Sequence, residues 1–299
     1  MLRPGPTSAV PDSVSYGGSG YNGSPTGLPA DVDPWREAAL KLRRAQQVLV
    51  FTGAGVSADS GIPTFRDDGG LWREFPPEQF ADLPGLWSTL RRQPERLAAF
   101  GAAVLAPVAA AHPNAAHRAL AKLEEHVPVV VVTQNVDGLH QEAGSRHVHE
   151  IHGSLLAVRS SLGGVRRLDR RQLARVVTSL GRISAGPAVI ARLAWSLRSL
   201  LGLGLTGIHR PDIVLFGEPL REPDWTIAQR AVHECDLMLV VGTSGLVMPA
   251  AVLPERARAR GCPVIVIDPH PPSEPCLWLE GRAADAVPRL VHDAFGSLD

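Results

Sequence analysis

Three histidines stand close together near the middle of the chain, and one of them is a candidate for moving a proton. His147, His149 and His152 fall within the run HVHEIHGS. His147 and His149 alternate, and no further ligand follows at a spacing typical of zinc sites, so the run does not predict a metal site. Imidazole titrates near neutral pH, so His152 is our candidate general base. A core histidine with satisfied hydrogen bonds is the alternative.

A second polar run, TQNVDGLH at residues 133–140, directly follows an apolar run at 127–132. In a parallel sheet such residues project from the carboxyl end of a strand, where ligands bind. Gln134, Asn135 and Asp137 are therefore expected to face a ligand cleft. Asn, Asp and Gly also favour turns on their own, so a simple turn is the alternative.

Glycines follow another apolar run in the same way. Residues 48–51 are apolar without alternation, which is typical of a strand covered on both faces. Gly53, Gly55 and Ala58 then match the spacing G-x-G-x-x-G/A, which lets the backbone turn tightly and approach a pyrophosphate. So short a motif also fits any strand-to-helix turn that needs a positive φ.

Helical and strand patterns alternate along most of the chain. Helices are expected at residues 34–46, 112–125, 223–234 and 249–260, and strands at 48–51, 127–132, 213–216, 237–241 and 264–267. Such alternation predicts right-handed crossovers and the α/β class, with a Rossmann-like parallel sheet and helices on both faces. The TQNVDGLH run and the turn of Gly53 each follow one of these strands.

Five motifs in order resemble those of the sirtuin family. They are GAGVSADSGIPTFR at 53–66, TQNVDGLH at 133–140, HG at 152–153, RPDIVLFGE at 210–218 and GTSGLVMPA at 242–250. The resemblance covers about residues 35–295. It implies an NAD-dependent protein-lysine deacylase that releases nicotinamide and O-acyl-ADP-ribose, with acylated-lysine proteins as its substrates.

The resemblance also implies roles for single residues. His152 would be the general base, with Asn135 and Asp137 as further catalytic residues in the nicotinamide pocket, and Phe65 and Arg66 in a loop that closes over the cofactor. NAD would contact Gly53, Ala54, Gly55, Ser57, Ile62, Phe65, Arg66, Gln134, Asn135, Asp137, Gly242, Thr243, Ser244 and Asp268. The substrate peptide would add as an extended strand beside Val214, Phe216, Gly217, Glu218, Gly245 and Val247.

Asp268 stands where the family usually has Asn. A carboxylate there can accept hydrogen bonds from both ribose hydroxyls, which favours NAD over NADP. In the acyl channel the chain also lacks the Tyr and Arg of sirtuins that prefer succinyl or malonyl groups. Residues 97–105 supply Ala99, Phe100, Ala102, Ala103 and Val104 instead. We therefore expect uncharged acyl groups, because an apolar channel does not compensate for desolvating a carboxylate.

A larger departure from the family lies between the HG and RPDIVLFGE motifs. Sirtuins typically carry two CxxC pairs there that hold a structural zinc, but this chain has no cysteine between His152 and Arg210. We therefore expect no structural zinc. The four ligand positions hold Ser160, Gly163, Gly202 and Leu205.

Amphipathic helices at 170–180 and 187–201 are predicted in place of the zinc module. The sequence thus predicts a small, mainly helical lobe at 156–209, inserted between the two parts of an NAD-binding domain at 34–155 and 210–299. A tail at 1–33, rich in Gly, Pro and Ser, is expected to be disordered.

Charge balance and cysteine placement indicate which binding partners and which cellular compartment to expect. Thirty Lys and Arg balance thirty Asp and Glu, which implies no general affinity for nucleic acid or membrane. A transmembrane helix at 188–205 is rejected because Arg192 and Arg198 would lie in hydrocarbon. Three cysteines placed singly, Cys235, Cys262 and Cys276, indicate buried thiols and a cytoplasmic location.

Two other functions remain open at this stage. A mono-ADP-ribosyltransferase or NAD hydrolase would use the same cofactor site, and a catalytically inactive protein could sense NAD. The sequence indicates neither the oligomeric state nor the protein substrate.

Overall fold

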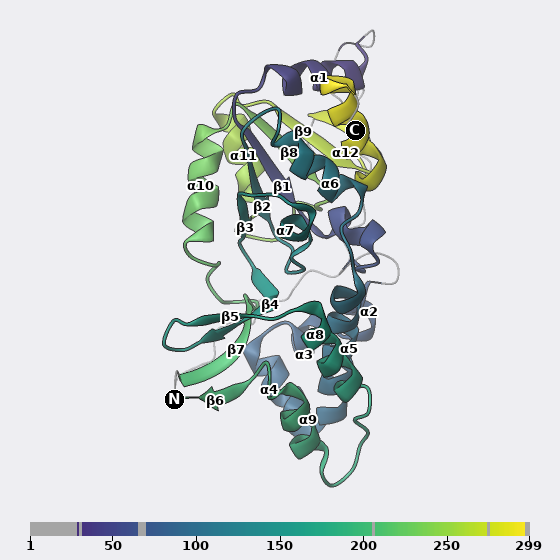
Figure 1. Cartoon of the computed structure of the whole chain (residues 1–299), viewed down its shortest axis with the longest axis vertical. Helices are drawn as coiled ribbons and strands as arrows, with labels where there is room; N and C mark the ends of the chain where they lie inside the picture. Colours follow the sequence, from purple (N-terminus) through teal and green to yellow (C-terminus); the bar gives the residue numbers. More distant parts are fainter. Residues whose placement is uncertain (1–28, 30–31, 65–69, 205–206, 274–275, 297–299) are drawn as a thin grey trace, which may run out of the picture.

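The chain forms two lobes, drawn one above the other in Figure 1. The computed structural model describes residues 29, 32–64, 70–204, 207–273 and 276–296. The upper lobe is built on a parallel sheet and the lower lobe on a small antiparallel sheet with helices beside it. The predicted α/β class is confirmed.

Six strands form the parallel sheet. They are β1 (Val48–Thr52), β2 (Val129–Thr133), β3 (Val148–Glu150), β8 (Leu237–Val241), β9 (Val264–Asp268) and β10 (Leu277–Glu280), in the order β10-β9-β8-β1-β2-β3. Every pairing is parallel, and Thr52 at the end of β1 lies level with Thr133 and Val241 at the ends of its neighbours. The polar motifs that follow these strands therefore meet at one edge.

Helices cover both faces of this sheet, which explains the unbroken apolar run of β1. Val48 and Val50 pack in one core with α1 (Pro34–Arg44), α6 (Ala115–Leu123) and α12 (Ala283–Phe295). Leu49 and Phe51 point the other way, into a core with α10 (Asp224–Glu234) and α11 (Val252–Ala259). Successive side chains of a strand face opposite ways, so both sets must be apolar.

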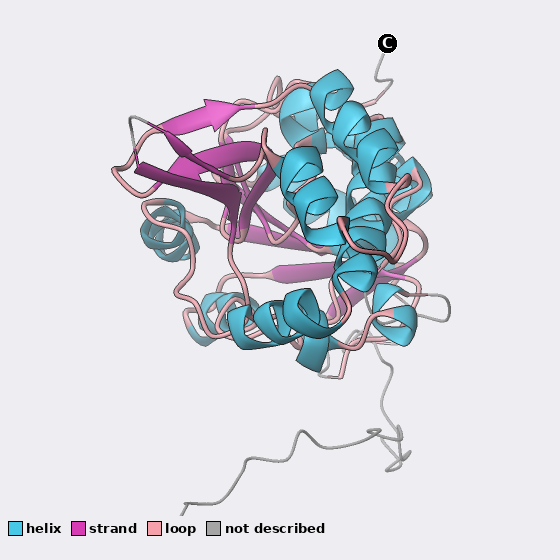
Figure 2. Ribbon diagram, turned by 90° about the horizontal axis from the view of Figure 1, so that it is seen from below, coloured by secondary structure: helices cyan, strands magenta, loops and turns pink. Residues whose placement is uncertain are grey.

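The lower lobe contains four antiparallel strands in the order β5-β4-β7-β6. They are β4 (Gly153–Ser160), β5 (Val165–Arg167), β6 (Gly202–Gly204) and β7 (Gly207–Ile213). Its longer helices are α4 (Leu83–Arg92), α5 (Pro94–Ala110), α8 (Arg170–Leu180) and α9 (Val189–Leu197), and the shorter ones are α2 (Leu71–Glu74) and α3 (Pro77–Phe80). Figure 2 shows these elements from below.

An aliphatic core holds the lower lobe together. Leu155 and Val158 of β4 pack with Leu173 of α8 and Leu193 of α9. Helix α5 joins the same core from outside the predicted insertion, through Ala98, Leu105 and Val108. The lobe is thus assembled from two separate stretches of sequence.

The structure corrects several boundaries. The helix predicted at 170–180 is confirmed as α8, whereas the one predicted at 187–201 is limited to α9. The strand predicted at 213–216 is wrong: β7 ends at Ile213 and belongs to the antiparallel sheet. A short apolar run gives no sign of which sheet its strand will join. The sequence also did not predict the antiparallel sheet itself.

The helices in the described part of the chain differ from membrane-spanning helices in length or hydropathy. No single helix there is long and apolar enough to cross a membrane, and α5 and α6 pass such a test only as a pair bent by 58°.

Candidate functional site

Two glycine-rich turns contact each other where β1 and β8 end. The amide of Gly53 donates to the carbonyl of Val241 at 3.1 Å, and that of Gly55 donates to the carbonyl of Gly242 at 2.9 Å. A Cβ on Gly53 would lie 2.7 Å from Thr243 Cβ, and one on Gly55 would lie 2.7 Å from Gly242 Cα. These glycines are therefore needed for the two turns to approach, in addition to any approach of a pyrophosphate.

Asn135, Ser57 and Asp137 form a hydrogen-bonded chain behind this turn. The Asn135 amide donates to the Gly53 carbonyl and to Ser57 Oγ, both at 3.0 Å. The Ser57 hydroxyl donates in turn to Asp137 Oδ2 at 2.7 Å. The predicted site residues of the first glycine motif and of TQNVDGLH are thus brought together. Each side chain fixes the rotamer of the next.

Asp137 is a buried carboxyl with a defined set of donors. Asp137 is only 4% exposed. Its Oδ1 accepts a hydrogen bond from the backbone amide of Leu139 at 2.9 Å. Burial raises the pKa of Asp137 above its usual range, against the lowering effects of the Leu139 and Ser57 hydrogen bonds. Such a carboxyl suits an acceptor that faces a polar ligand from a dry pocket.

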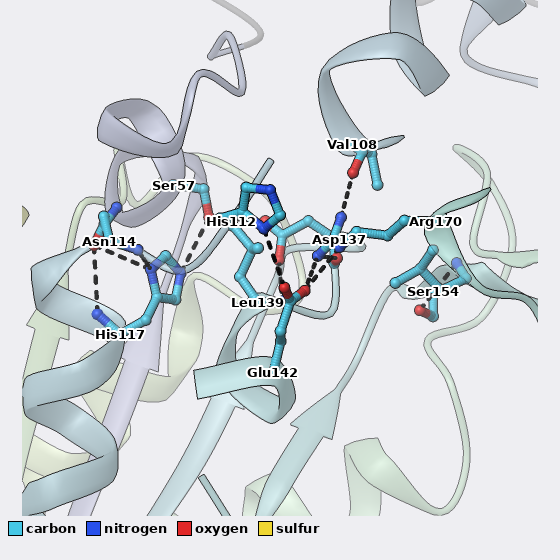
Figure 3. Close-up of polar contacts among 11 residues, drawn as sticks. Ser57, Val108, His112, Asn114, His117, Asp137, Leu139, Glu142, Ser154 and Arg170 are labelled. Atoms are coloured by element: carbon cyan, nitrogen blue, oxygen red, sulfur yellow. Dashed lines mark hydrogen bonds and ion pairs between the residues drawn. The ribbon is translucent and has the colours of Figure 1, made fainter. Parts of the chain in front are cut away.

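Arg170 links the loop of Asp137 to the lower lobe (Figure 3). It is the first residue of α8, and its guanidinium donates to the carbonyls of Val108 and Asp137, the latter at 3.1 Å. Nε also donates to Glu142 Oε2 at 2.7 Å, in α7 (Leu139–Ala143). The guanidinium thus joins α5, α7, α8 and the Asp137 loop. Sequence reasoning missed it, because only its place at a helix start marked it out.

His152 lies between β3 and β4, where the chain passes from one sheet to the other. Its Nδ1 is 2.9 Å from the carbonyl of Gln134, which accepts only from a protonated nitrogen. Nε2 is therefore the nitrogen that carries the free lone pair. Burial lowers the pKa of His152 below 6.5, against a smaller opposing effect of this hydrogen bond. The imidazole is neutral at pH 7 and suited to accept a proton.

The glycine after His152 lets the chain make this passage. Gly153 has a φ of +78°, and a Cβ there would overlap the carbonyl of Asp212 in the neighbouring strand β7. The His152 carbonyl then accepts the amide of Val214 at 2.9 Å. The backbone of the pair HG is thus joined to the start of the 214–218 segment.

Residues predicted to contact the adenosine end lie along the ends of β8 and β9. Gln134 Nε2 donates to Thr243 Oγ1 at 2.9 Å, which joins the β2 end to the β8 turn. Asp268 ends β9, and its Oδ1 accepts the amide of His270 at 2.9 Å. Ser244 is exposed, and Ala54 and Ile62 are partly so. Hydroxyls and a carboxylate at this edge are suitable partners for ribose hydroxyls.

The predicted peptide-binding segments are both accessible. Phe216, Gly217 and Gly245 are exposed, whereas Val214 and Val247 are half-buried. Glu218 plays a structural part: it accepts two hydrogen bonds from Arg210, at 2.6 and 2.7 Å, and one from the Leu215 amide at 3.0 Å. Its carboxylate thereby closes the turn that presents Phe216.

Two buried histidines and a half-buried glutamate were not predicted. His117 of α6 lies 3.4 Å from Ser57 Oγ, and its ring packs on that of His140. Burial lowers the pKa of both, that of His117 to about 4. Burial also raises the pKa of Glu150 to about 7. His140 stands inside the TQNVDGLH run, which was the available signal. Phe65 and Arg66 lie outside the described residues.

This arrangement fits a dinucleotide such as NAD. The two glycine turns approach closely, the carboxyl of Asp137 lies behind them, and Thr243, Ser244 and Asp268 place hydroxyls and a carboxylate at the strand ends. The fold and the site together define an α/β protein that binds a nucleotide at the carboxyl edge of its parallel sheet.

Comparison with known proteins supports a nucleotide-binding α/β protein. A profile of the Sir2 family matches residues 53–249. An "NAD-dependent protein deacylase" of Desulfosudis oleivorans is 41% identical over 261 residues, covering 85% of this chain and 93% of that protein. The chain belongs to the Sir2 family.

Solved structures give the same result. A Sir2 homologue in complex with NAD has a TM-score of 0.68 and 32% identity, covering 86% of this chain and 93% of the other. A Sir2 protein with a deacetylated p53 peptide and 3′-O-acetyl ADP-ribose has a TM-score of 0.68 and 27% identity, covering 87% and 98%.

Proposed function

We propose that this protein is an NAD-dependent protein-lysine deacylase that releases nicotinamide and O-acyl-ADP-ribose. The observation that carries the proposal is the geometry of His152. Its Nδ1 is bonded to the Gln134 carbonyl, which leaves the lone pair on Nε2, and its backbone carbonyl is bonded to the Val214 amide. The similarity to relatives named as deacylases supports the same activity.

The chain's residues would act in sequence. Asp137, held by Ser57 and Leu139, would accept a hydrogen bond from the carboxamide of nicotinamide and orient that group for departure. The oxygen of the acyl-lysine carbonyl would attack C1′ of the ribose as the bond to nicotinamide breaks, so the protein would supply no nucleophile. His152 would then take a proton from a ribose hydroxyl, which would let the 2′-oxygen attack the acyl carbon. Addition of water and cleavage of the acyl C–N bond would release free lysine and O-acyl-ADP-ribose.

The lower lobe would keep its shape without zinc. The positions of the family's metal ligands hold Ser160, Gly163, Gly202 and Leu205, and none of these supplies a thiolate. The aliphatic core around Leu173 and Leu193 and the guanidinium of Arg170 are the interactions that would stabilise the lobe instead.

Acyl groups without charge would be the preferred substrates. The ring centroids of Phe100 in α5 and Phe80 in α3 lie 4.7 Å apart, and Ala102 and Val104 of α5 pack against the aliphatic core. Succinyl and malonyl groups would have to lose their hydration against these apolar side chains.

Product analysis tests this proposal. The purified protein is incubated with NAD and lysine peptides that carry acetyl, longer apolar acyl or succinyl groups, and all products are identified by mass. We expect O-acyl-ADP-ribose, free nicotinamide and unmodified lysine, with succinyl removed more slowly than acetyl. ADP-ribose alone would indicate an NAD hydrolase, and ADP-ribosylated peptide would indicate a transferase. NAD binding without nicotinamide release would indicate a sensor. Each of these outcomes contradicts the deacylase.

A further inference from the structure

The other end of the parallel sheet carries a pair of neighbouring thiols. Cys235 follows the last residue of α10, and Cys262 lies in the loop between α11 and β9. Their sulfur atoms are 3.7 Å apart, although the residues are 27 apart in sequence. They are 5% and 8% exposed, respectively. A disulfide bond requires about 2.0 Å between the sulfurs, so a modest side-chain rotation separates the two states.

A guanidinium stands beside this pair. Arg260 Nη1 donates to the carbonyl of Val232 at 2.5 Å, and the thiol of Cys235 donates to the same carbonyl at 3.5 Å. The positive charge therefore lies close to both sulfurs and favours a thiolate over a thiol. The contact with Cys235, together with Arg260, lowers the pKa of Cys262 against the opposite effect of burial, while the same contact and burial raise the pKa of Cys235. Cys262, the more exposed of the two, takes the role of attacking sulfur and Cys235 that of resolving sulfur.

We propose that Cys235 and Cys262 form a reversible intramolecular disulfide when the protein meets a peroxide. The Cys262 thiolate attacks one oxygen of hydrogen peroxide, the O–O bond breaks, and hydroxide leaves, which gives a sulfenic acid. The Cys235 sulfur then attacks the Cys262 sulfur and displaces the hydroxyl group, which takes up the thiol proton and leaves as water. Two thiols lose two electrons in total, and the peroxide is reduced to two waters.

The position of the pair predicts what the bond would change. The strands β8 and β9 begin just after Cys235 and Cys262, and the Met238 amide donates to the Pro263 carbonyl at 2.9 Å. The nucleotide site lies at the opposite ends of these two strands. Each strand is five residues long and rises about 3.3 Å per residue. A bond here would close a loop in the unfolded chain and leave the site geometry unchanged. We therefore expect a gain in stability with unaltered turnover.

The test uses the full chain, with hydrogen peroxide as the oxidant. Peptide mapping after alkylation under denaturing conditions should find Cys235 joined to Cys262, with Cys276 alkylated and the protein mass lower by two hydrogens. The melting midpoint should rise by several degrees and return after treatment with dithiothreitol. NAD-dependent turnover at 25 °C should stay the same in both forms.

Single variants identify the partners. Cys276→Ala should still lose two thiols on oxidation, whereas Cys235→Ala and Cys262→Ala should form no intramolecular disulfide. Three alkylated cysteines after oxidation of the unaltered chain would overturn the proposal, and so would a disulfide that contains Cys276 or a disulfide-linked dimer. The mapping of the unaltered chain decides the matter even if a variant folds poorly. Its outcome is independent of the deacylase assignment.

Discussion

The two lobes place their side chains in different ways. In the upper lobe, Asn135, Asp137 and the turn of Gly53 come directly from strand ends and are joined by hydrogen bonds of 2.7–3.0 Å. In the lower lobe the interior is aliphatic, and Arg170 reaches across to the Asp137 loop. The upper lobe thus holds reactive groups in place, and the lower lobe contributes shape. Changes in the first should reduce the rate before the stability, and changes in the second should do the opposite.

Replacing His152 should have the largest effect on rate. We expect His152→Ala to lower deacylation by about 10²–10⁴-fold while NAD binding persists, because the imidazole acts after the cofactor is seated. Steady-state rates and calorimetric NAD binding measure the two effects. His147→Ala is the matched control, since His147 is exposed in the same run. A His152 variant with near-normal turnover would remove the assignment of the base.

The pH profile sharpens the same point. Only neutral imidazole accepts a proton, and burial lowers the pKa of His152 below 6.5. The rate should therefore be unaffected by this group near pH 7 and decline as the pH falls below 6.5. A decline that begins well above pH 7 would contradict the lowered pKa of His152, and its persistence in His152→Ala would show that another residue limits the reaction.

A charge in the lower-lobe core should have the largest effect on stability. Leu193 is 3% exposed, and Leu193→Asp should cost about 3–5 kcal/mol because an unpaired carboxylate replaces a buried leucine. Ile190 is 57% exposed on the same helix, so Ile190→Asp should change the free energy of unfolding by less than about 0.5 kcal/mol. Urea unfolding compares the two. Equal losses would contradict an aliphatic core at Leu193.

Breaking the link between the lobes should have an intermediate effect. Arg170→Ala removes a donor from the enclosed carbonyls of Val108 and Asp137, at an expected cost of about 2–3 kcal/mol. The Asp137 loop should loosen as well, so the KM for NAD should rise while kcat falls less. Arg171→Ala removes an exposed neighbour and serves as the control. Kinetics indistinguishable between these two variants would show that the link does not position Asp137.

Glu150 gives the smallest expected effect, and it depends on pH. Its Oε1 is enclosed without a hydrogen-bond partner among the described residues, and burial raises its pKa from 4.5 to about 7. A raised folded pKa contributes stability that is full below pH 4.5 and lost as pH rises through 7. Glu150→Gln should remove this pH-dependent loss between pH 4.5 and 7. Parallel pH–stability curves for the two proteins would contradict the assignment.

The sequence predicted the upper lobe well because its signals are local. An apolar run followed by glycine, as at residues 48–55, fixes a strand, a turn and a strand end at once. The parallel sheet then brings Asn135 and Asp137 to Gly53 without further information. The sequence did not predict the hydrogen bonds within this cluster, such as those of Ser57 with Asn135 and Asp137.

The lower lobe was less predictable because its contacts are distant in sequence. The strand β4 pairs with β7 across about fifty residues, and no local pattern marks that partner. Arg170 reads in the sequence as one of several arginines on a solvated helix. Only its position at the start of α8, opposite Val108 and Asp137, gives the guanidinium its enclosed acceptors.

We propose that a Sir2-type site works beside a lobe that packs without metal. The most direct test is metal analysis of the active protein, with the deacylation rate and melting midpoint measured before and after a chelator. We expect far less than one zinc per chain and no change in either quantity. One tightly bound zinc per chain, or loss of activity and structure on chelation, would contradict the claim.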